Sequence, residues 1–172
     1  MGSSGQIVLV IGAILLLGTI ILYADRLVVN KTSRLYETEG TITATSIGQA
    51  FIEEVTSKRF DENYALPNFT DDVAKLVPSN SLGVDAGEVS TNSNTFDDID
   101  DYNGYARKVS TPRLGNFTVS SSIYYIADSS PDVKSPIQTW MKRIDVKVRN
   151  PYVLSPDSTV ALSKIVSYRY KK

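Results

Sequence analysis

The stretch IVLVIGAILLLGTIILYA, residues 7–24, decides the architecture that the rest of the chain has to fit. No charged side chain precedes Asp25, and only Gly12, Gly18 and Thr19 interrupt the apolar run. As a helix, the run spans roughly 27 Å at ~1.5 Å per residue, about the hydrocarbon thickness of a bilayer. The remainder has the composition of a polar, soluble domain. The sequence therefore predicts an apolar stem on a soluble head, with the stem in a bilayer, in a protein assembly, or in each in turn.

Composition excludes several classes of function. The 172 residues suffice for one domain and an appendage, and they include no cysteine and no histidine. Disulfides, thiolate nucleophiles, Ser-His-Asp catalysis and the usual zinc sites are therefore excluded. The net charge of −1 gives no electrostatic footprint for nucleic acid. We expect no enzyme, no catalytic residue and no cofactor; a carboxylate-based hydrolase on a membrane stalk is the least favoured alternative.

A helical pattern continues beyond the apolar run. Apolar residues recur every seven positions and then at spacings of three and four, at Val28, Leu35, Ile42, Ile47, Ala50, Phe51 and Val55. We expect one helix over residues 6–57, roughly 78 Å long at ~1.5 Å per residue. Its amphipathic half would press this apolar stripe against the head. Gly40, followed by two β-branched threonines and an isoleucine at 41–43, predicts a kink or an unwound turn.

The chain divides into two predicted parts. Residues 1–57 form the N-terminal helix, with an apolar half at 7–24 and an amphipathic half at 25–57. Residues 58–172 form a globular head, with a loop region at 58–104 and a sheet at 105–172. Within the loop region, a short helix is expected at 71–76, where Thr70 could cap an acidic first turn.

From residue 105 the apolar period changes towards two, which predicts four strands at 105–110, 116–127, 138–149 and 159–170. The second strand is the clearest, because Phe117, Val119, Ser121, Ile123 and Tyr125 alternate with more polar neighbours. Turn-forming residues at 128–131 and 150–157 make the connections short, which favours an antiparallel meander with one apolar face. The expected fold class is α+β: a long N-terminal helix packed on a four-stranded antiparallel sheet.

This order of elements resembles type IV pilins and pseudopilins, and three segments resemble the family in detail. AFIEEV (50–55) is similar to the Glu-rich turn near the end of their long helix. FDDIDDYNG (96–104) resembles the acidic motif before the sheet in minor pilins of the mannose-sensitive haemagglutinin type. KRIDVKV (142–148) resembles the third strand of the same proteins. The resemblance covers nearly the whole chain.

The sequence departs from the family at its start. The family begins with a basic leader, a glycine cleavage site and a segment with Glu at its fifth position; no such leader is seen here. Counted from Met1 the fifth residue is Gly5, and counted from Gly2 it is Gln6. Gln6 offers a neighbouring subunit only a neutral hydrogen bond, weaker than the charge-assisted one that the family's glutamate makes.

The resemblance implies a structural subunit of an extracellular filament similar to a type IV pilus. The chain would lie in the inner membrane first, and pilus or secretion assembly machinery would then extrude it into a helical homopolymer of identical subunits. The expected subunit interface is one side of the apolar helix: Gln6, Ile7, Val10, Ile11, Ile14, Leu15, Gly18, Ile21, Leu22 and Val28. The alternative is a membrane-anchored extracytoplasmic protein, for binding or for filament assembly, that does not polymerise.

One acidic group is a candidate calcium site. Its oxygen-bearing side chains are Asp97, Asp98, Asp100, Asp101 and Asn103. Their spacing does not match an EF-hand. A solvated turn with Asx-type hydrogen bonds at the entry to the sheet is the simpler interpretation, and we favour it. No other metal site is expected.

Two further groups complete the set of candidates. Asn30, Asn68 and Asn116 each begin an N-x-Thr triplet, so they are glycosylation candidates in a lineage that modifies such triplets. Glu53 and Glu54 form an acidic pair that we expect to face solvent or to contact Lys58 at the end of the helix.

Overall fold

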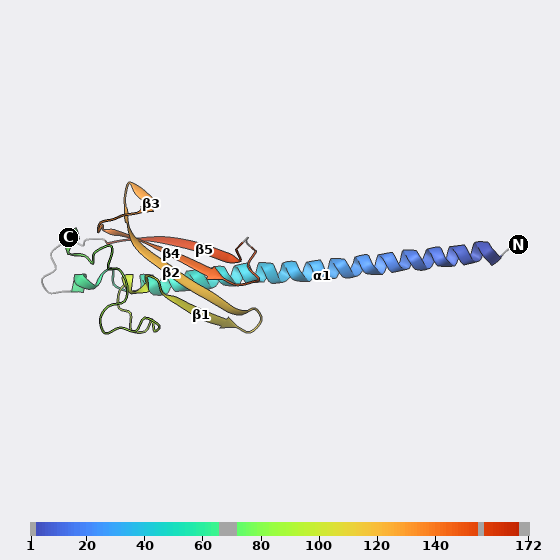
Figure 1. The fold of residues 1–172 in the computed structure, drawn as a ribbon, viewed down its shortest axis with the longest axis horizontal. Helices are drawn as coiled ribbons and strands as arrows, with labels where there is room; N and C mark the ends of the chain where they lie inside the picture. Colours follow the sequence, from blue (N-terminus) through green and yellow to red (C-terminus); the bar gives the residue numbers. More distant parts are fainter. Residues whose placement is uncertain (1–2, 66–71, 155–156, 169–172) are drawn as a thin grey trace.

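The computed structural model describes residues 3–65, 72–154 and 157–168. One long helix, α1 (Ser3–Thr56), lies beside an antiparallel sheet and extends far beyond it (Figure 1). This arrangement confirms the predicted α+β class, with five strands instead of four. The strands are β1 (Ala106–Thr111), β2 (Gly115–Ala127), β3 (Ser130–Lys134), β4 (Met141–Arg149) and β5 (Thr159–Ser167).

The sheet follows the predicted meander. Its order is β1-β2-β4-β5, every pairing is antiparallel, and β3 pairs with the end of β2. The predicted alternation along β2 is confirmed, because Phe117, Val119, Ser121, Ile123 and Tyr125 are all buried. On β4, the inward row consists of Ile144, Val146 and Val148, which are fully buried.

Strand β3 is the strand that the sequence did not predict. Its five residues are all exposed, so they carry no alternation of apolar and polar positions. Pro131, which suggested a turn, lies within it and has no N–H to donate to a ladder. Proline is tolerated at a sheet edge, where one side of the strand needs no partner. Pairing is limited to Ile126 with Lys134 and Ala127 with Ser130, with a register shift between the two.

Helix α1 runs through Gly40 without a break, so the expected kink is absent. The reason for the glycine is close packing. A Cβ atom at Gly40 would lie 2.5 Å from the backbone oxygen of Tyr152, and one at Gly48 would lie 2.6 Å from the Leu162 side chain. Both glycines therefore let the head approach the helix backbone, and this packing outweighs their low helix propensity.

The helix packs on β4 and β5 along a stripe that matches the predicted one only towards its C-terminal end, where Ile47, Phe51 and Val55 contact the core. The residues that it buries against the head are Gly40, Ala44, Gly48, Phe51, Ile52 and Val55. Val28, Leu35 and Ile42 are each more than 60% exposed, and Ala50 is exposed as well, so the expectation that they face the head was wrong. Small residues four apart form a flat strip on one side of a helix, and that strip allows the closer contact with the strands.

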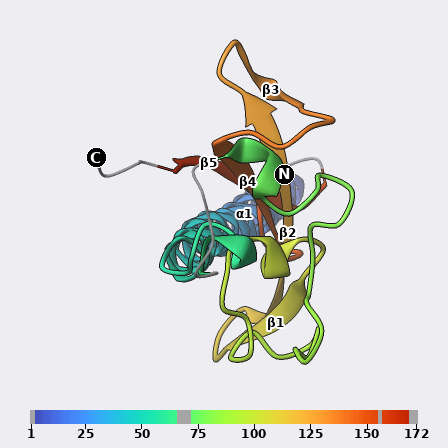
Figure 2. The same cartoon turned by 90° about the vertical axis from the view of Figure 1, so that its left-hand side faces the viewer.

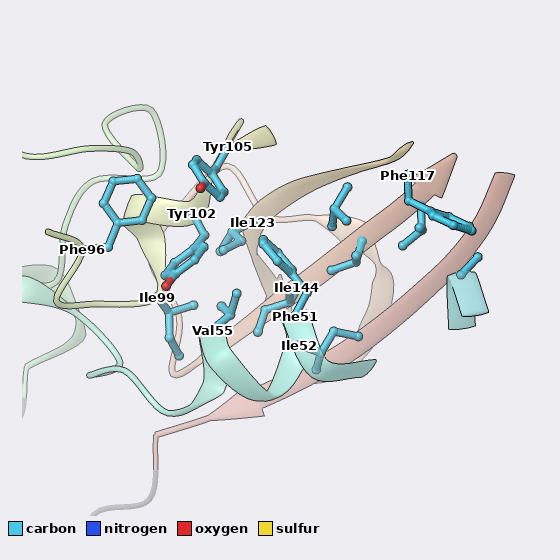
Figure 3. Packing of buried hydrophobic residues seen from close by; sticks show 14 of the residues in the cluster. Phe51, Ile52, Val55, Phe96, Ile99, Tyr102, Tyr105, Phe117, Ile123 and Ile144 are labelled. Atoms are coloured by element: carbon cyan, nitrogen blue, oxygen red, sulfur yellow. The ribbon is translucent and has the colours of Figure 1, made fainter. Parts of the chain in front are cut away.

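Aromatic rings fill the space between the end of α1 and the loop region (Figure 3). The Phe96 ring lies edge-on to Tyr102 and Tyr105, with centroid distances of 4.9 and 5.2 Å. Phe51 of the helix stacks on Tyr105 at 6.2 Å and meets Tyr102 edge-on. Edge-to-face contacts of this kind contribute beyond simple burial. Thus the acidic motif's own Phe96 and Tyr102 anchor it in the core.

The loop region lies around the C-terminal end of α1, next to β1 and β2 (Figure 2). In its described residues, 58–65 and 72–104, the helical elements are short 3-10 turns: η1 (Glu62–Ala65), η2 (Val73–Lys75) and η3 (Asp100–Tyr102). The expected helix at 71–76 is reduced to η2, which Asp72 caps by accepting from the Ala74 N–H at 3.0 Å; Thr70 lies outside the described residues.

Candidate functional site

The first functional feature is the apolar rod, residues 7–24 of α1, which stands clear of the head (Figure 1). Its large side chains are all at least half exposed, and successive residues at 14–17 place them on every side of the helix. A helix that is apolar all round belongs in a membrane or in the core of a larger assembly. The helix is long and apolar enough to cross a membrane; a signal sequence near an N-terminus has the same properties.

The exposed apolar surface continues past the rod. Beyond the first charged residue, Val28, Leu35 and Ile42 occupy successive heptad positions and are 64, 69 and 63% exposed. From Ile7 to Ile42 the helix covers roughly 53 Å at ~1.5 Å per residue. The hydrocarbon core of a bilayer is about 30 Å thick. Part of this surface therefore lies outside any bilayer that holds the rod.

The predicted interface residues all lie on this free part of α1. Those from Gln6 to Val28 are exposed, except for Gly18, which is half-exposed. These predicted residues form one side of the rod. The structure leaves the other sides equally free, so the candidate surface also includes Val8, Leu9, Leu16, Leu17 and Ile20.

The second feature is a buried lysine, Lys142, at the start of β4. Lys142 is fully buried, and its ammonium donates to Asp61 Oδ2 at 3.1 Å, to Asp100 Oδ1 at 2.7 Å and to the Phe60 carbonyl at 2.6 Å. The Tyr125 hydroxyl also donates to Asp61. This network joins the loop region to the sheet. The Lys142 ammonium is enclosed, so a substrate cannot reach it.

The third feature is a carboxylate cluster next to this network, which we define as Glu62, Asp85, Glu88, Asp97, Asp98 and Asp101. It contains two triads, in each of which one carboxylate oxygen per residue lies within 4.8 Å of the others: Glu62 with Asp85 and Asp98, and Glu88 with Asp97 and Asp101. Arg59 pairs with Glu62 at 3.4 Å and with Asp97. The chain segments are held together by backbone bonds: Arg59 N–H donates to the Asp97 carbonyl and Ile99 N–H to the Arg59 carbonyl.

The crowding of these acids changes their protonation. Burial, reinforced by the neighbouring charge of Asp100, raises the pKa of Asp98 to about 9. Burial and the contact with Asp101 raise the pKa of Glu88 to about 7. The pKa values of Glu62 and Asp85 are raised as well, first by burial and then by adjacent carboxylates. Without a cation, Asp98 therefore retains its proton at neutral pH and Glu88 retains it in part.

The five predicted calcium ligands separate into two groups. Asp97, Asp98 and Asp101 belong to the carboxylate cluster. Asp100 instead pairs with Lys142, and Asn103 is used structurally, since it donates to the Leu82 carbonyl and accepts from the Ile123 N–H. The favoured interpretation as a solvated turn was wrong in one respect: the Asx-type bonds are present, but Asp98, Asp100 and Asp101 are at most 2% exposed. Glu62, Asp85 and Glu88 come from other parts of the loop region, and no sequence pattern indicated that they join the cluster.

The other predicted groups lie apart. Asn30 is exposed on α1 and Asn116 on β2, while Asn68 lies outside the described residues. Glu53 is exposed as expected. Glu54 instead forms an ion pair with Arg107 of β1 at 2.6 Å, and Lys58 donates to the Phe96 carbonyl.

The chain matches no model of a known protein family, no curated protein and no solved structure.

Proposed function

We propose that this protein is a structural subunit of an extracellular filament similar to a type IV pilus, and that it polymerises through its apolar helix. The rod first lies in the membrane and then exchanges lipid for the rods of identical subunits. The heads form the outer wall, and assembly machinery in the inner membrane drives the exchange. No catalysis, cofactor or nucleic acid is part of this proposal.

The observation that carries the proposal is the length of the exposed apolar surface. A membrane anchor needs about 30 Å of apolar helix, whereas exposed apolar side chains here extend over roughly 53 Å. Leu35 and Ile42 are surrounded by water if the chain remains a solitary anchored protein. Packing against neighbouring helices removes them from water at about 25 cal/mol per Å² of apolar area. A polymer therefore explains why Leu35 and Ile42 are apolar, whereas insertion of the rod into a bilayer does not explain it.

A membrane-anchored extracytoplasmic protein that does not polymerise is the second candidate. It is favoured by the rod itself, because its residues are apolar on every side and its length matches one bilayer. Lipid covers such a surface as well as other helices do. The two candidates differ in what surrounds the helix between residues 28 and 42.

Leu35→Gln distinguishes them. In the filament, a polar side chain at this position enters a helix–helix contact, so we expect few or no fibres in material sheared from cells and examined by electron microscopy. In the solitary anchor, Leu35 lies in water and the substitution changes nothing. The variant leaves the rod intact, so membrane insertion is unaffected in either case.

Ser33→Gln is the matched control, because it replaces a polar residue on nearly the opposite side of the same helix turn. Fibres from cells carrying the control, together with equal amounts of both variants in the membrane, would attribute the loss to Leu35. Wild-type cells without fibres containing this chain would refute the filament, and normal fibres from the Leu35→Gln variant would refute the extended helix contact.

A further inference from the structure

The carboxylate cluster contains more acid than its surroundings neutralise. Arg59 pairs with Glu62 and Asp97. Asp85, Glu88, Asp98 and Asp101 have no ion pair with a cation anywhere in residues 3–65, 72–154 and 157–168. The nearby Lys142 is already engaged by Asp61 and Asp100. An uncompensated buried carboxylate is costly, so the two buried members, Asp98 and Asp101, need either a proton or a cation.

Two oxygen atoms indicate where that partner would lie. Asp98 Oδ1 accepts from the N–H groups of Asp100 and Asp101, at 2.8 and 3.3 Å, but Asp98 Oδ2 has no partner. Asp101 Oδ2 accepts from the N–H groups of Asp97 and Asp98, both at 3.0 Å, but Asp101 Oδ1 has no partner. Both side chains are 99% buried. Each carboxylate is thus fixed by one oxygen, with the other oxygen free, and buried polar atoms left in this state are rare in folded proteins.

The two aspartates that carry these free oxygens belong to different triads. Asp98 groups with Glu62 and Asp85, and Asp101 groups with Glu88 and Asp97. The oxygens of each triad are within 4.8 Å of one another, a separation that ligands on one ion of 2.3–2.6 Å bond length can have. The partners come from η1, from residues 85–88 and from the acidic motif. Three separate chain segments therefore contribute carboxylates to the cluster, which is not simply a run of neighbouring aspartates.

We propose that the carboxylate cluster binds calcium, with Asp98 and Asp101 as its central ligands. All six side chains offer hard oxygen ligands, and Ca²⁺ takes six to eight of these in flexible geometry. Zinc prefers nitrogen and sulfur ligands, which this chain cannot supply from His or Cys. Magnesium requires near-ideal octahedral geometry and usually retains several waters, so a crowded all-carboxylate site suits it less. The site does not depend on the proposed filament.

Calcium at this position would fasten the loop region to the helix. Glu62 begins η1, which follows α1 after five residues, Asp85 and Glu88 lie in the long loop, and the acidic motif leads into β1. Of these, Asp85 is exposed and makes a local contact, its N–H donating to Glu88 Oε2 at 3.2 Å. An ion bridging the three segments would order the loop, and the head would then be more stable with calcium than without it.

The test uses the full chain in detergent micelles, stripped of metal with a chelator and titrated with calcium chloride to about 5 mM, above the affinity range of extracellular calcium modules. Unfolding of the head is followed by the fluorescence of its single tryptophan. We expect the melting temperature to rise by about 5 °C or more at a hundredfold excess over Kd. Isothermal titration should give one or two ions per chain, and magnesium at the same concentration should give less than half the shift.

Asp98→Asn and Glu88→Gln remove one charge from each triad, and we expect each to weaken calcium binding at least tenfold. Asp128→Asn is the matched control, since it removes one exposed charge from the β2–β3 turn and should bind as the wild type does. If Asp98→Asn does not fold, Glu88→Gln decides, because Glu88 is only half-buried. An unchanged melting temperature at about 5 mM calcium, an equal effect of magnesium, or normal binding by Glu88→Gln overturns the proposal.

Discussion

Lys142 shows how much a single buried charge contributes to this head. Its place on β4 points inward, because it continues the row of Ile144, Val146 and Val148. Its charge is tolerated there since two carboxylates and a carbonyl accept from its ammonium, and since the Phe60 ring lies 4.7 Å from it. Removing one member of such a network leaves the others buried without compensation.

We therefore expect Lys142→Met to lower the free energy of unfolding by about 3 kcal/mol or more, because Asp61 and Asp100 lose their shared cation. Urea unfolding in detergent, followed by tryptophan fluorescence, measures the change. Lys147→Met, an exposed position on the same strand, is the control and should change stability by about 0.5 kcal/mol or less. Equal stability of the two variants would show that the buried pair has no net effect.

At the scale of elements, α1 is joined to the sheet edge by one ion pair as well as by apolar packing. Glu54 on the helix contacts Arg107 of β1 at 2.6 Å and accepts from the Tyr102 hydroxyl at 3.1 Å. The Arg107 guanidinium also lies 5.0 Å from the Phe51 ring centre. Partial burial raises the pKa of Glu54, but its bond and charge contact with Arg107, aided by Ser93 and Tyr102, outweigh burial and lower the pKa from 4.5.

This shift predicts a pH dependence. A carboxylate whose pKa is lowered in the folded state stabilises the fold fully above the unfolded value of 4.5 and loses that effect as pH falls through the folded pKa. Glu54→Gln should therefore cost about 1 kcal/mol at pH 7, and the difference from wild type should shrink as pH falls below 4.5. Thermal melts of both proteins between about pH 3 and 7 measure it. Glu53→Gln, at the exposed neighbouring position, is the control, and a pH-independent difference would contradict the assignment.

For the molecule as a whole, the rod and the head are physically separate. Among the described residues, the head meets α1 from about residue 30 onwards, where Leu154 lines a pocket with Asn30, Ser33, Arg34 and Glu37. The Tyr36 ring then lies 5.8 Å from that of Tyr152, and Glu39 pairs with Arg113. None of the window that could cross a membrane is buried. The head's core and the rod's surface can therefore be changed independently.

A chain that begins at residue 25 should consequently fold with the same head stability and remain monomeric in water without detergent. Its melting temperature should match that of the full chain within about 2 °C, because no core contact is removed. Light scattering measures its mass, with the full chain in detergent as the reference. A large loss of stability would show that the rod supports the head, and fibres formed by the shortened chain would contradict polymerisation through the rod.

The sequence predicted the elements whose patterns are regular. The period of two along residues 116–127 located β2 and its buried side chains, and the uncharged run at 7–24 located the rod. The turn-rich segment with Pro131 hid β3, since a fully exposed edge strand has no alternation to detect. The apolar heptad at Val28, Leu35 and Ile42 indicated the wrong face of the helix, because the head selects small residues at the contact.

The candidate site was predicted only in part, for a similar reason. Asp97, Asp98 and Asp101 are adjacent in the chain, so their grouping is visible in the sequence. Glu62, Asp85 and Glu88 are brought to them by the fold of the loop region, which has no periodic pattern.

By itself, the sequence determined that an apolar helix carries a soluble α+β head, because hydrophobic periodicity is a local property that depends on neighbouring residues alone. Only the tertiary structure decided which helix face meets the sheet, which lysine is buried and which carboxylates converge. These depend on shape and charge between segments far apart in the chain, and no local pattern records them.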